Sequence, residues 1–88
     1  MLDHSQDYSW VQGRLEYSAI GGGMWKVRYA PVSVDDSNGG SVILDIDPTQ
    51  QGFQPGDTVR VQGQIASGET RRGAANPVYR VQRMTRVE

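Results

Sequence analysis

The segment that decides the fold is DTVRVQGQIA, residues 57–66. Apolar and polar residues alternate in it, as is typical of a β-strand with one face buried and the other in water. The inward residues are Val59, Val61 and Ile65, and the outward residues are Arg60, Gln62 and Gln64. Gly63 occupies an inward position, and a glycine inside a strand often marks a bulge or a close approach of another backbone. The segment therefore predicts a sharply bent strand.

A second segment, VQGRL at residues 11–15, repeats the pattern of VQGQI at residues 61–65. Its glycine, Gly13, again stands where an inward side chain is expected. A chance match of five residues is the alternative interpretation. Two bent strands can coil around a small core, and closing them into a barrel removes the exposed strand edges that promote aggregation. We therefore expect a closed or nearly closed barrel.

The rest of the chain divides in the same way. Glycine, proline, asparagine and aspartate cluster between apolar runs, which predicts turns between five strands at residues 8–18, 24–32, 41–46, 57–66 and 78–87. No window shows an apolar period of 3.6 residues, so we expect an all-β protein without a long helix. In the last strand the inward apolar positions begin at Tyr79 and Val81 but continue at Met84 and Val87. This change of alternation near Arg83 predicts a bulge.

Length and composition limit the possible functions. The chain has 88 residues, enough for one small domain, and we expect a flexible polar tail at residues 1–7 and a single barrel domain at residues 8–88. The absence of cysteine excludes disulfides and thiol catalysis, and the single histidine, His4, excludes a multi-histidine metal site. The longest apolar run, residues 42–44, is far shorter than the ~20 residues of a membrane helix. We expect a soluble monomer with no membrane segment, either cytoplasmic or exported without its signal peptide.

Three segments resemble a known family. PGDTVRVQGQI at residues 55–65 resembles the fourth strand of oligonucleotide/oligosaccharide-binding (OB) domains, and residues 11–15 and 77–81 resemble their first and fifth strands. The resemblance covers residues 8–87 and implies a five-stranded Greek-key barrel whose fifth strand lies between the third and the fourth. An SH3-like barrel is the alternative architecture.

Many OB domains also carry a helix between the third and fourth strands. Here the corresponding residues 47–56 contain two prolines and two glycines. These residues disfavour a helix. We therefore expect an OB-like barrel without that helix, in which Phe53 plugs the barrel.

The resemblance also implies a ligand surface, because OB domains bind ligands across strands two and three and the neighbouring loops. The candidate nucleic-acid-binding residues on this surface and on the last strand are Met24, Lys26, Arg28, Ile43, Arg71, Arg72 and Arg80. Lysine and arginine neutralise phosphates, although a solvated basic surface is the alternative interpretation. The candidate stacking residues are Trp10, Trp25 and Tyr29. Alternation places Trp25 and Tyr29 in the core, and a shift of one residue would expose both. Trp10 falls on the polar side, either as a contact residue or as a cap on one end of the barrel.

The net charge of −1 is the difference between two opposed parts of the chain. Residues 1–59 hold three basic and eight acidic side chains, a net charge of −5, and residues 60–88 hold six and two, a net charge of +4. The total argues against indiscriminate binding of polyanions. A local anion-binding site remains compatible with it.

Catalytic and metal-binding sites are not expected. Residues 35–39, DDSNG, have the composition of a calcium loop but lack its alternating ligands and terminal glutamate. Asp45 and Asp47 share a strand face, but no nucleophile or histidine lies near them in the sequence. We therefore expect no enzymatic activity, no metal and no cofactor.

These patterns predict a non-catalytic binding module, most simply one that binds single-stranded nucleic acid across strands two and three and the loop between strands four and five. The alternative is a protein-interaction or cell-envelope module that binds a protein partner. A third hypothesis, oligosaccharide binding, requires an exposed Trp10 or Trp25.

Overall fold

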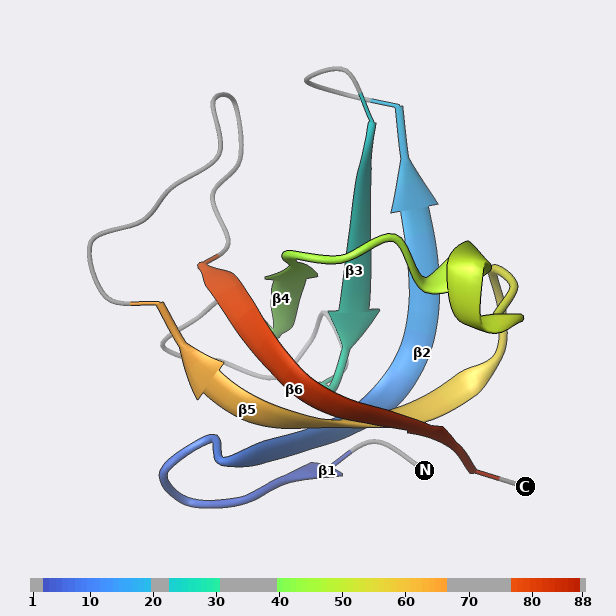
Figure 1. Cartoon of the computed structure of the whole chain (residues 1–88). Helices are drawn as coiled ribbons and strands as arrows, with labels where there is room; N and C mark the ends of the chain where they lie inside the picture. The colour runs from blue at the N-terminus through green and yellow to red at the C-terminus, as the bar shows by residue number, and fades with distance from the viewer. Residues whose placement is uncertain (1–2, 20–22, 31–39, 67–76, 88) are drawn as a thin grey trace.

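The computed structural model describes residues 3–19, 23–30, 40–66 and 77–87, and Figure 1 shows their arrangement. Within these residues the chain forms six strands and one short 3-10 helix. They are β1 (Asp3–His4), β2 (Trp10–Ser18), β3 (Met24–Arg28), β4 (Ser41–Leu44), the 3-10 helix η2 (Pro48–Gln51), β5 (Thr58–Ile65) and β6 (Val78–Arg86). The predicted all-β class is confirmed.

Five of the strands close into a barrel. The sheet order is β1-β2-β3-β4-β6-β5, and a further pairing between β2 and β5 completes the circle. The pairings are antiparallel except for that of β4 with β6, which is parallel. β6 therefore lies between β4 and β5, as the resemblance predicted. β1 is an extra strand on the outside of β2.

The two strand glycines allow the barrel to close. A Cβ on Gly13 would overlap the backbone carbonyl of Arg28, and a Cβ on Gly63 would overlap that of Arg80. At Gly13 the bent β2 pairs with β3 and β5 at once, since Arg14 is opposite both Arg28 and Thr58. The prediction that these glycines mark close backbone approaches is confirmed.

The predicted bulge in the last strand is also present. Gln62 is opposite Arg83 but Gly63 is opposite Val81, so Gln82 is an extra residue on β6. The extra residue lies next to Arg83, where the alternation of the sequence changes. It returns Met84 to the inward face, where it is buried.

The core fills the barrel with inward residues from all five strands. Its buried members are Val11, Leu15, Val27, Tyr29, Ala30, Val42, Leu44, Phe53, Val59, Val61, Tyr79 and Met84. Tyr79 donates a hydrogen bond from its hydroxyl to the carbonyl of Tyr8 (2.7 Å), and burial raises its pKa to about 12. The core position predicted for Tyr29 is confirmed, and Trp25 is half-buried against the same cluster.

The link between β4 and β5 contains η2, a single turn of 3-10 helix. Asp47 caps it by accepting a hydrogen bond from the backbone N–H of Thr49 (3.0 Å), and Gly52 ends it in a left-handed conformation. The expectation that no long helix forms here is confirmed, and Phe53 joins the core. In the described part of the chain, no helix has the length and apolarity needed to span a membrane.

The N-terminal segment differs from the expected free tail. Asp3 and His4 pair with Gln12 and Val11 as strand β1. The His4 ring stacks on Tyr8 with 4.4 Å between centroids and meets the edge of Tyr29 at 5.0 Å. Strand pairing and aromatic packing together attach residues 3–4 to the barrel.

Candidate nucleic-acid interface

The predicted binding surface crosses the outer face of β3 and β4, and two of its candidates are not accessible there. Ile43 has 0% of its surface exposed and Met24 has 3%. Both lie on the outward face of their strands, as alternation predicted. Ile43 is flanked by Lys26 on β3 and by Val78 on β6. Met24 and Ile43 are therefore removed from the contact list.

The basic residues of this surface have acidic neighbours. The Nε of Arg28 lies 3.5 Å from a carboxylate oxygen of Glu16, and Lys26 is directly opposite Glu16 in the register of β2 and β3. Both basic side chains are only partly exposed. One glutamate thus offsets much of the positive charge on this surface.

The structure places the other candidate binding residues on different parts of the protein or does not describe them. Arg71 and Arg72 lie outside the described residues. Tyr29 is 2% exposed in the core, as the alternation predicted, so the shifted register that would expose it for stacking does not occur. Arg80 is exposed on β6, and Trp10 and Trp25 are partly exposed on different parts of the barrel.

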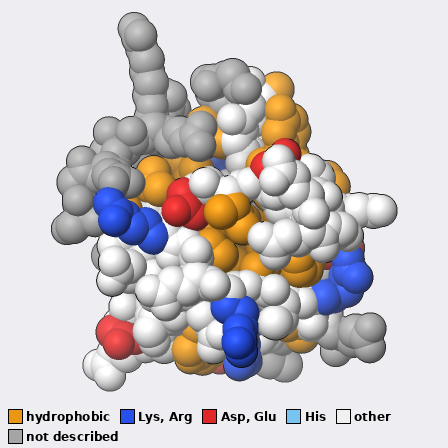
Figure 2. Space-filling view, viewed as in Figure 1, with side chains coloured by type: hydrophobic (Ala, Val, Ile, Leu, Met, Phe, Trp, Pro, Cys, Tyr) orange, Lys and Arg blue, Asp and Glu red, His pale blue; other side chains and the backbone are white. Residues whose placement is uncertain are grey.

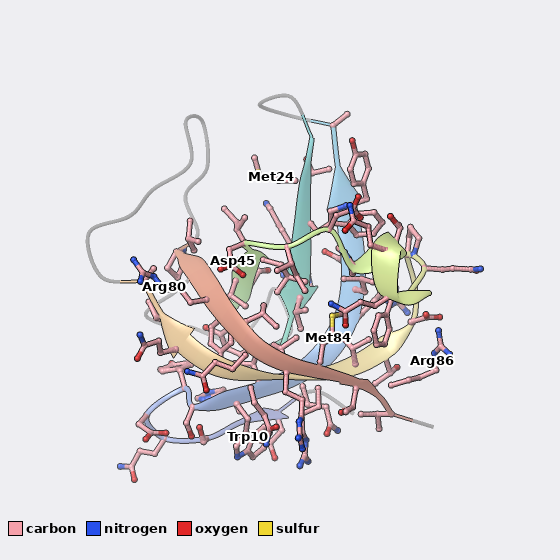
Figure 3. All side chains as sticks on the ribbon, viewed as in Figure 1. Trp10, Met24, Asp45, Arg80, Met84 and Arg86 are labelled. Carbon is pink, nitrogen blue, oxygen red and sulfur yellow. The ribbon has the colours of Figure 1, made fainter. Side chains whose placement is uncertain are left out.

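A different surface gathers three of the four arginines of β5 and β6, without Arg86. This surface lies on the outside of β2, β5 and β6. Gln62 on β5 is opposite Trp10 on β2 and opposite Arg83 on β6. On either side of Gln62 along β5, Arg60 is opposite Thr85 and Gln64 is opposite Arg80. We call this surface the arginine face and define it by Trp10, Arg60, Gln62, Gln64, Arg80 and Arg83. Figure 3 shows that Trp10 and Arg80 both point away from the barrel interior.

Trp10 and Arg60 form the centre of the arginine face. The guanidinium carbon of Arg60 lies 4.6 Å from the centroid of the indole ring, a cation–π distance. The Nε of Arg60 also donates a hydrogen bond to the side-chain oxygen of Gln12 (3.1 Å). These two contacts fix the guanidinium beside the aromatic ring.

A shallow pocket of about 510 Å³ adjoins the indole. Ser9, Trp10, Gln62, Gly63, Gln82 and Arg83 line it. Its position follows from the backbone, since β5 bends at Gly63 and β6 bulges at Gln82 at the same level. The pocket thus presents an aromatic ring, a guanidinium and two carboxamides to solvent.

Two acidic residues lie near the edge of the arginine face. Asp3, on β1, is opposite Gln12 on β2. Asp7 accepts hydrogen bonds from the Ser9 backbone N–H (3.1 Å) and the Ser5 hydroxyl (3.0 Å). The bonds from Ser9 and Ser5 lower the pKa of Asp7, so it is ionised at neutral pH. The surface is therefore locally basic with an acidic margin, which disfavours non-selective polyanion binding.

The spacing of Arg80, Arg83 and Arg86 in the sequence predicted that two or three of them share an outer face of the last strand, but it did not combine them with Trp10, Arg60, Gln62 and Gln64. The available signal was the alternation itself, which places Arg60, Gln62 and Gln64 on the outward face of one strand. Within the described residues, no three histidine or acidic side chains gather as a metal site would require. No protein-family model, curated protein or solved structure matches this chain.

Proposed function

We propose that this protein is a non-catalytic, OB-like module that binds single-stranded nucleic acid through its arginine face. The strand order is compatible with an OB-like barrel. The observation that carries the proposal is the position of Trp10 against Arg60 with Arg83 in the adjoining pocket. An aromatic ring beside arginines suits a nucleobase and its neighbouring phosphates, because bases stack on aromatic side chains and arginine neutralises phosphate.

The proposal moves the binding site from the β3 and β4 surface to the opposite side of β2. The β3 and β4 surface has two buried candidates and an Arg28 paired with Glu16. Arg60, Arg80 and Arg83 are all exposed on the arginine face. The glutamines beside them supply amide donors and acceptors for base edges.

The predicted binding is weak and depends on salt. If about three arginines each neutralise one phosphate, the logarithm of the binding constant falls with the logarithm of salt concentration with a slope of about −2. Replacing Trp10 by alanine is expected to weaken binding about 5-fold to 100-fold, the usual contribution of one stacked base. Arg83→Gln should make the slope less negative by about 0.7.

Fluorescence anisotropy of a labelled mixed-sequence oligonucleotide at several salt concentrations measures these effects. Arg14→Gln is the matched control, because Arg14 is an exposed arginine on β2 outside the arginine face. Lys26→Gln tests the surface that the sequence predicted. The proposal is wrong if wild-type protein gives no anisotropy change at low salt, or if Arg14→Gln or Lys26→Gln weakens binding as much as Arg83→Gln.

A protein-interaction module is the second candidate. Tryptophan and arginine are the residues most enriched at the energetic centres of protein interfaces. The same arginine face would then contact an acidic protein segment. In the anisotropy experiment this candidate predicts no response to the oligonucleotide.

A further inference from the structure

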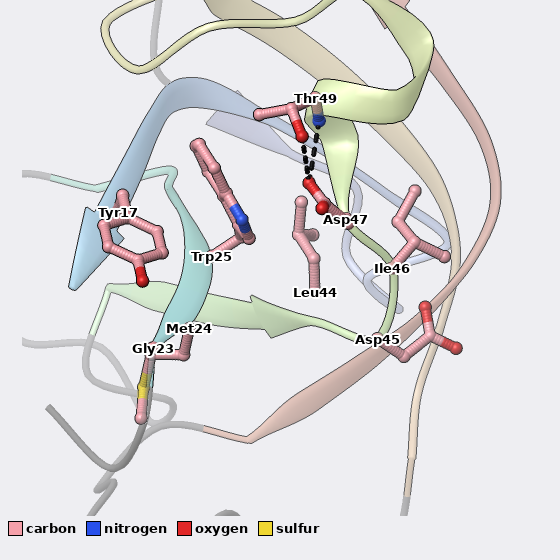
Figure 4. Close-up of a pocket in the computed structure, with 9 residues that line it drawn as sticks. All are labelled: Tyr17, Gly23, Met24, Trp25, Leu44, Asp45, Ile46, Asp47 and Thr49. Atoms are coloured by element: carbon pink, nitrogen blue, oxygen red, sulfur yellow. Dashed lines mark hydrogen bonds between the residues drawn. The ribbon is translucent and has the colours of Figure 1, made fainter. Parts of the chain in front are cut away.

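A second pocket, independent of the arginine face, lies at the mouth of the barrel. It has a volume of about 460 Å³ and is lined by Tyr17, Gly23, Met24, Trp25, Leu44, Asp45, Ile46, Asp47 and Thr49. Figure 4 shows the two aromatic rings on one side and the 45–49 segment on the other. We call it the mouth pocket.

The aromatic wall of the mouth pocket is a cross-strand pair. Tyr17 on β2 is opposite Trp25 on β3, with 4.9 Å between ring centroids and an angle of 58° between ring planes. Both residues occupy inward positions by alternation, but they lie beyond the core at the strand ends. Tyr17 is consequently 53% exposed, although it lies on the same face of β2 as the buried Leu15.

The opposite wall combines apolar and acidic side chains. Leu44 and Ile46 supply the apolar part, and Asp45 and Asp47 supply two exposed carboxylates. In the view of Figure 2, apolar side chains occupy the middle of the face, acidic side chains adjoin them, and Lys and Arg lie to the left, to the right and below.

Hydrogen bonds fix both carboxylates in place. Asp47 Oδ1 accepts from the backbone N–H of Thr49 (3.0 Å) and also from its hydroxyl, and Asp45 Oδ1 accepts from the backbone N–H of Val81 (3.0 Å). Within the described residues, neither carboxylate forms an ion pair, and no lysine, arginine or histidine is part of the described lining. The described lining therefore carries two carboxylates and two aromatic rings, and in Figure 4 the side chain of Asp47 points into the space between the two walls whereas that of Asp45 points away from the rings.

We propose that the mouth pocket binds an organic ammonium ion, either a small free cation or the side chain of a lysine in a peptide. Cations are attracted to the faces of tryptophan and tyrosine rings, and ammonium groups are the ligands that such aromatic sites recognise. The carboxylates add Coulombic attraction, and Leu44 and Ile46 contact the aliphatic part of the ligand. A phosphate-bearing ligand is disfavoured here by the same charges.

The test uses Trp25 as the reporter. The chain has two tryptophans, so Trp10→Phe leaves Trp25 as the single tryptophan, which can be excited selectively at about 295 nm or longer, without altering the lining of the mouth pocket. The ligands titrated at constant ionic strength are choline, Nα-acetyl-lysine methylamide, cellobiose and the neutral carbon isostere of choline. We expect saturable millimolar binding of the two cations and at least about 5-fold weaker binding of the neutral isostere. The relative affinities of choline and the lysine derivative distinguish a free cation from a peptide side chain.

Substitution of the carboxylates tests whether their charge contributes to cation binding while the fold stays intact. Asp47→Asn and Asp45→Asn keep the hydrogen-bond acceptor but remove the charge. Asp47→Asn is expected to weaken cation binding about 3-fold to 10-fold. Asp45→Asn is expected to weaken it less, because the Asp45 carboxylate points away from the rings in Figure 4. Asp3→Asn is the matched control, because it makes the same change in net charge on strand β1. Tyr17→Ala, at an exposed position, should weaken binding without unfolding the protein.

Three results would overturn the proposal. They are equal binding of choline and its neutral isostere, binding of cellobiose that is unaffected by Asp47→Asn, and the absence of any saturable response in a folded protein. Arg83→Gln should leave choline binding unchanged, so failure of nucleic-acid binding does not affect this test.

Discussion

At Gly13 and Gly63 a single hydrogen atom in place of a methyl group allows two strands to touch. A methyl group at either position would overlap the carbonyl oxygen of Arg28 or Arg80, and these oxygens belong to the backbone and cannot rotate away. We expect Gly13→Ala and Gly63→Ala each to lower the free energy of unfolding by about 3 to 5 kcal/mol, the range of severe core disruptions. Chemical denaturation monitored by circular dichroism measures the loss.

Gly56→Ala is the control for these two substitutions. Gly56 has a positive φ of 94° but no atom within 4 Å of its Cβ position, so only the conformational cost applies. That cost is about 1 to 2 kcal/mol. A Gly13→Ala variant no less stable than Gly56→Ala would show that the close backbone approach is not needed.

Among the elements, the end of β6 is attached to the turn that follows η2. Arg86 Nη2 donates to the Gly52 carbonyl and to Asp57 Oδ2, each at 3.0 Å, and its guanidinium carbon lies 5.3 Å from the Phe53 ring centroid. Asp57 Oδ2 also accepts from the backbone N–H of Gln54 (2.9 Å). Arg86 thus adds side-chain contacts to a link that the burial of Phe53 and backbone hydrogen bonds to Leu15 also hold against the barrel.

These contacts make stability depend on pH through Asp57. The hydrogen bond from Gln54, followed by the bond from Arg86, lowers the pKa of Asp57 below its ordinary 3.8. Because the folded pKa is lowered, the stabilisation is fully present above pH 3.8 and is lost as pH falls through the lowered value. Asp57→Asn should therefore lower the urea midpoint at pH 7, and its difference from wild type should shrink below pH 3.8.

Urea titrations of both proteins from strongly acidic to neutral pH check this prediction. Asp7 has a lowered pKa as well, so the variant keeps part of the acid dependence. Arg86→Gln should remove part of the same stabilisation. The urea midpoint of the double variant should be only slightly lower than that of Asp57→Asn alone. If the difference in urea midpoint between Asp57→Asn and wild type stays constant with pH, the ionisation of Asp57 is not the source of the stabilisation.

For the molecule as a whole, the contact between β4 and β6 is the weakest point of barrel closure. It is the parallel pairing, and its register contains two residue pairs, Ile43 with Val78 and Leu44 with Tyr79. The backbone bonds there run from Ile43 N–H to the Pro77 carbonyl (2.9 Å) and from Asp45 N–H to the Tyr79 carbonyl (3.3 Å). Parallel pairs are slightly less stable than antiparallel ones.

Hydrogen exchange followed by NMR tests this difference. The amides of Ile43 and Asp45 should exchange faster than the hydrogen-bonded amides shared by β5 and β6, because local opening begins where the fewest contacts must break. Equal protection at both places would mean that the barrel opens only by global unfolding.

Much of the fold could be predicted from the sequence because strand formation and bending are local properties. Alternation identified the five barrel strands, the glycines marked the bends, and the irregularity near Arg83 located the bulge at Gln82. Proline and glycine at residues 47–56 excluded a long helix. The proposed binding surface was harder to predict from the sequence, because Trp10, Arg60 and Arg83 lie on three strands, and only the strand pairing brings them together.

The local pattern of residues thus specifies which residues form strands and which side of each strand faces inward. Where along the barrel the core ends and which outward residues become neighbours depend on how the strands pair in three dimensions. Tyr17 faces inward yet is exposed at the mouth, whereas Ile43 faces outward yet is buried. The physical reason is that alternation depends on one strand's backbone geometry, but exposure and clustering depend on register and closure among all the strands.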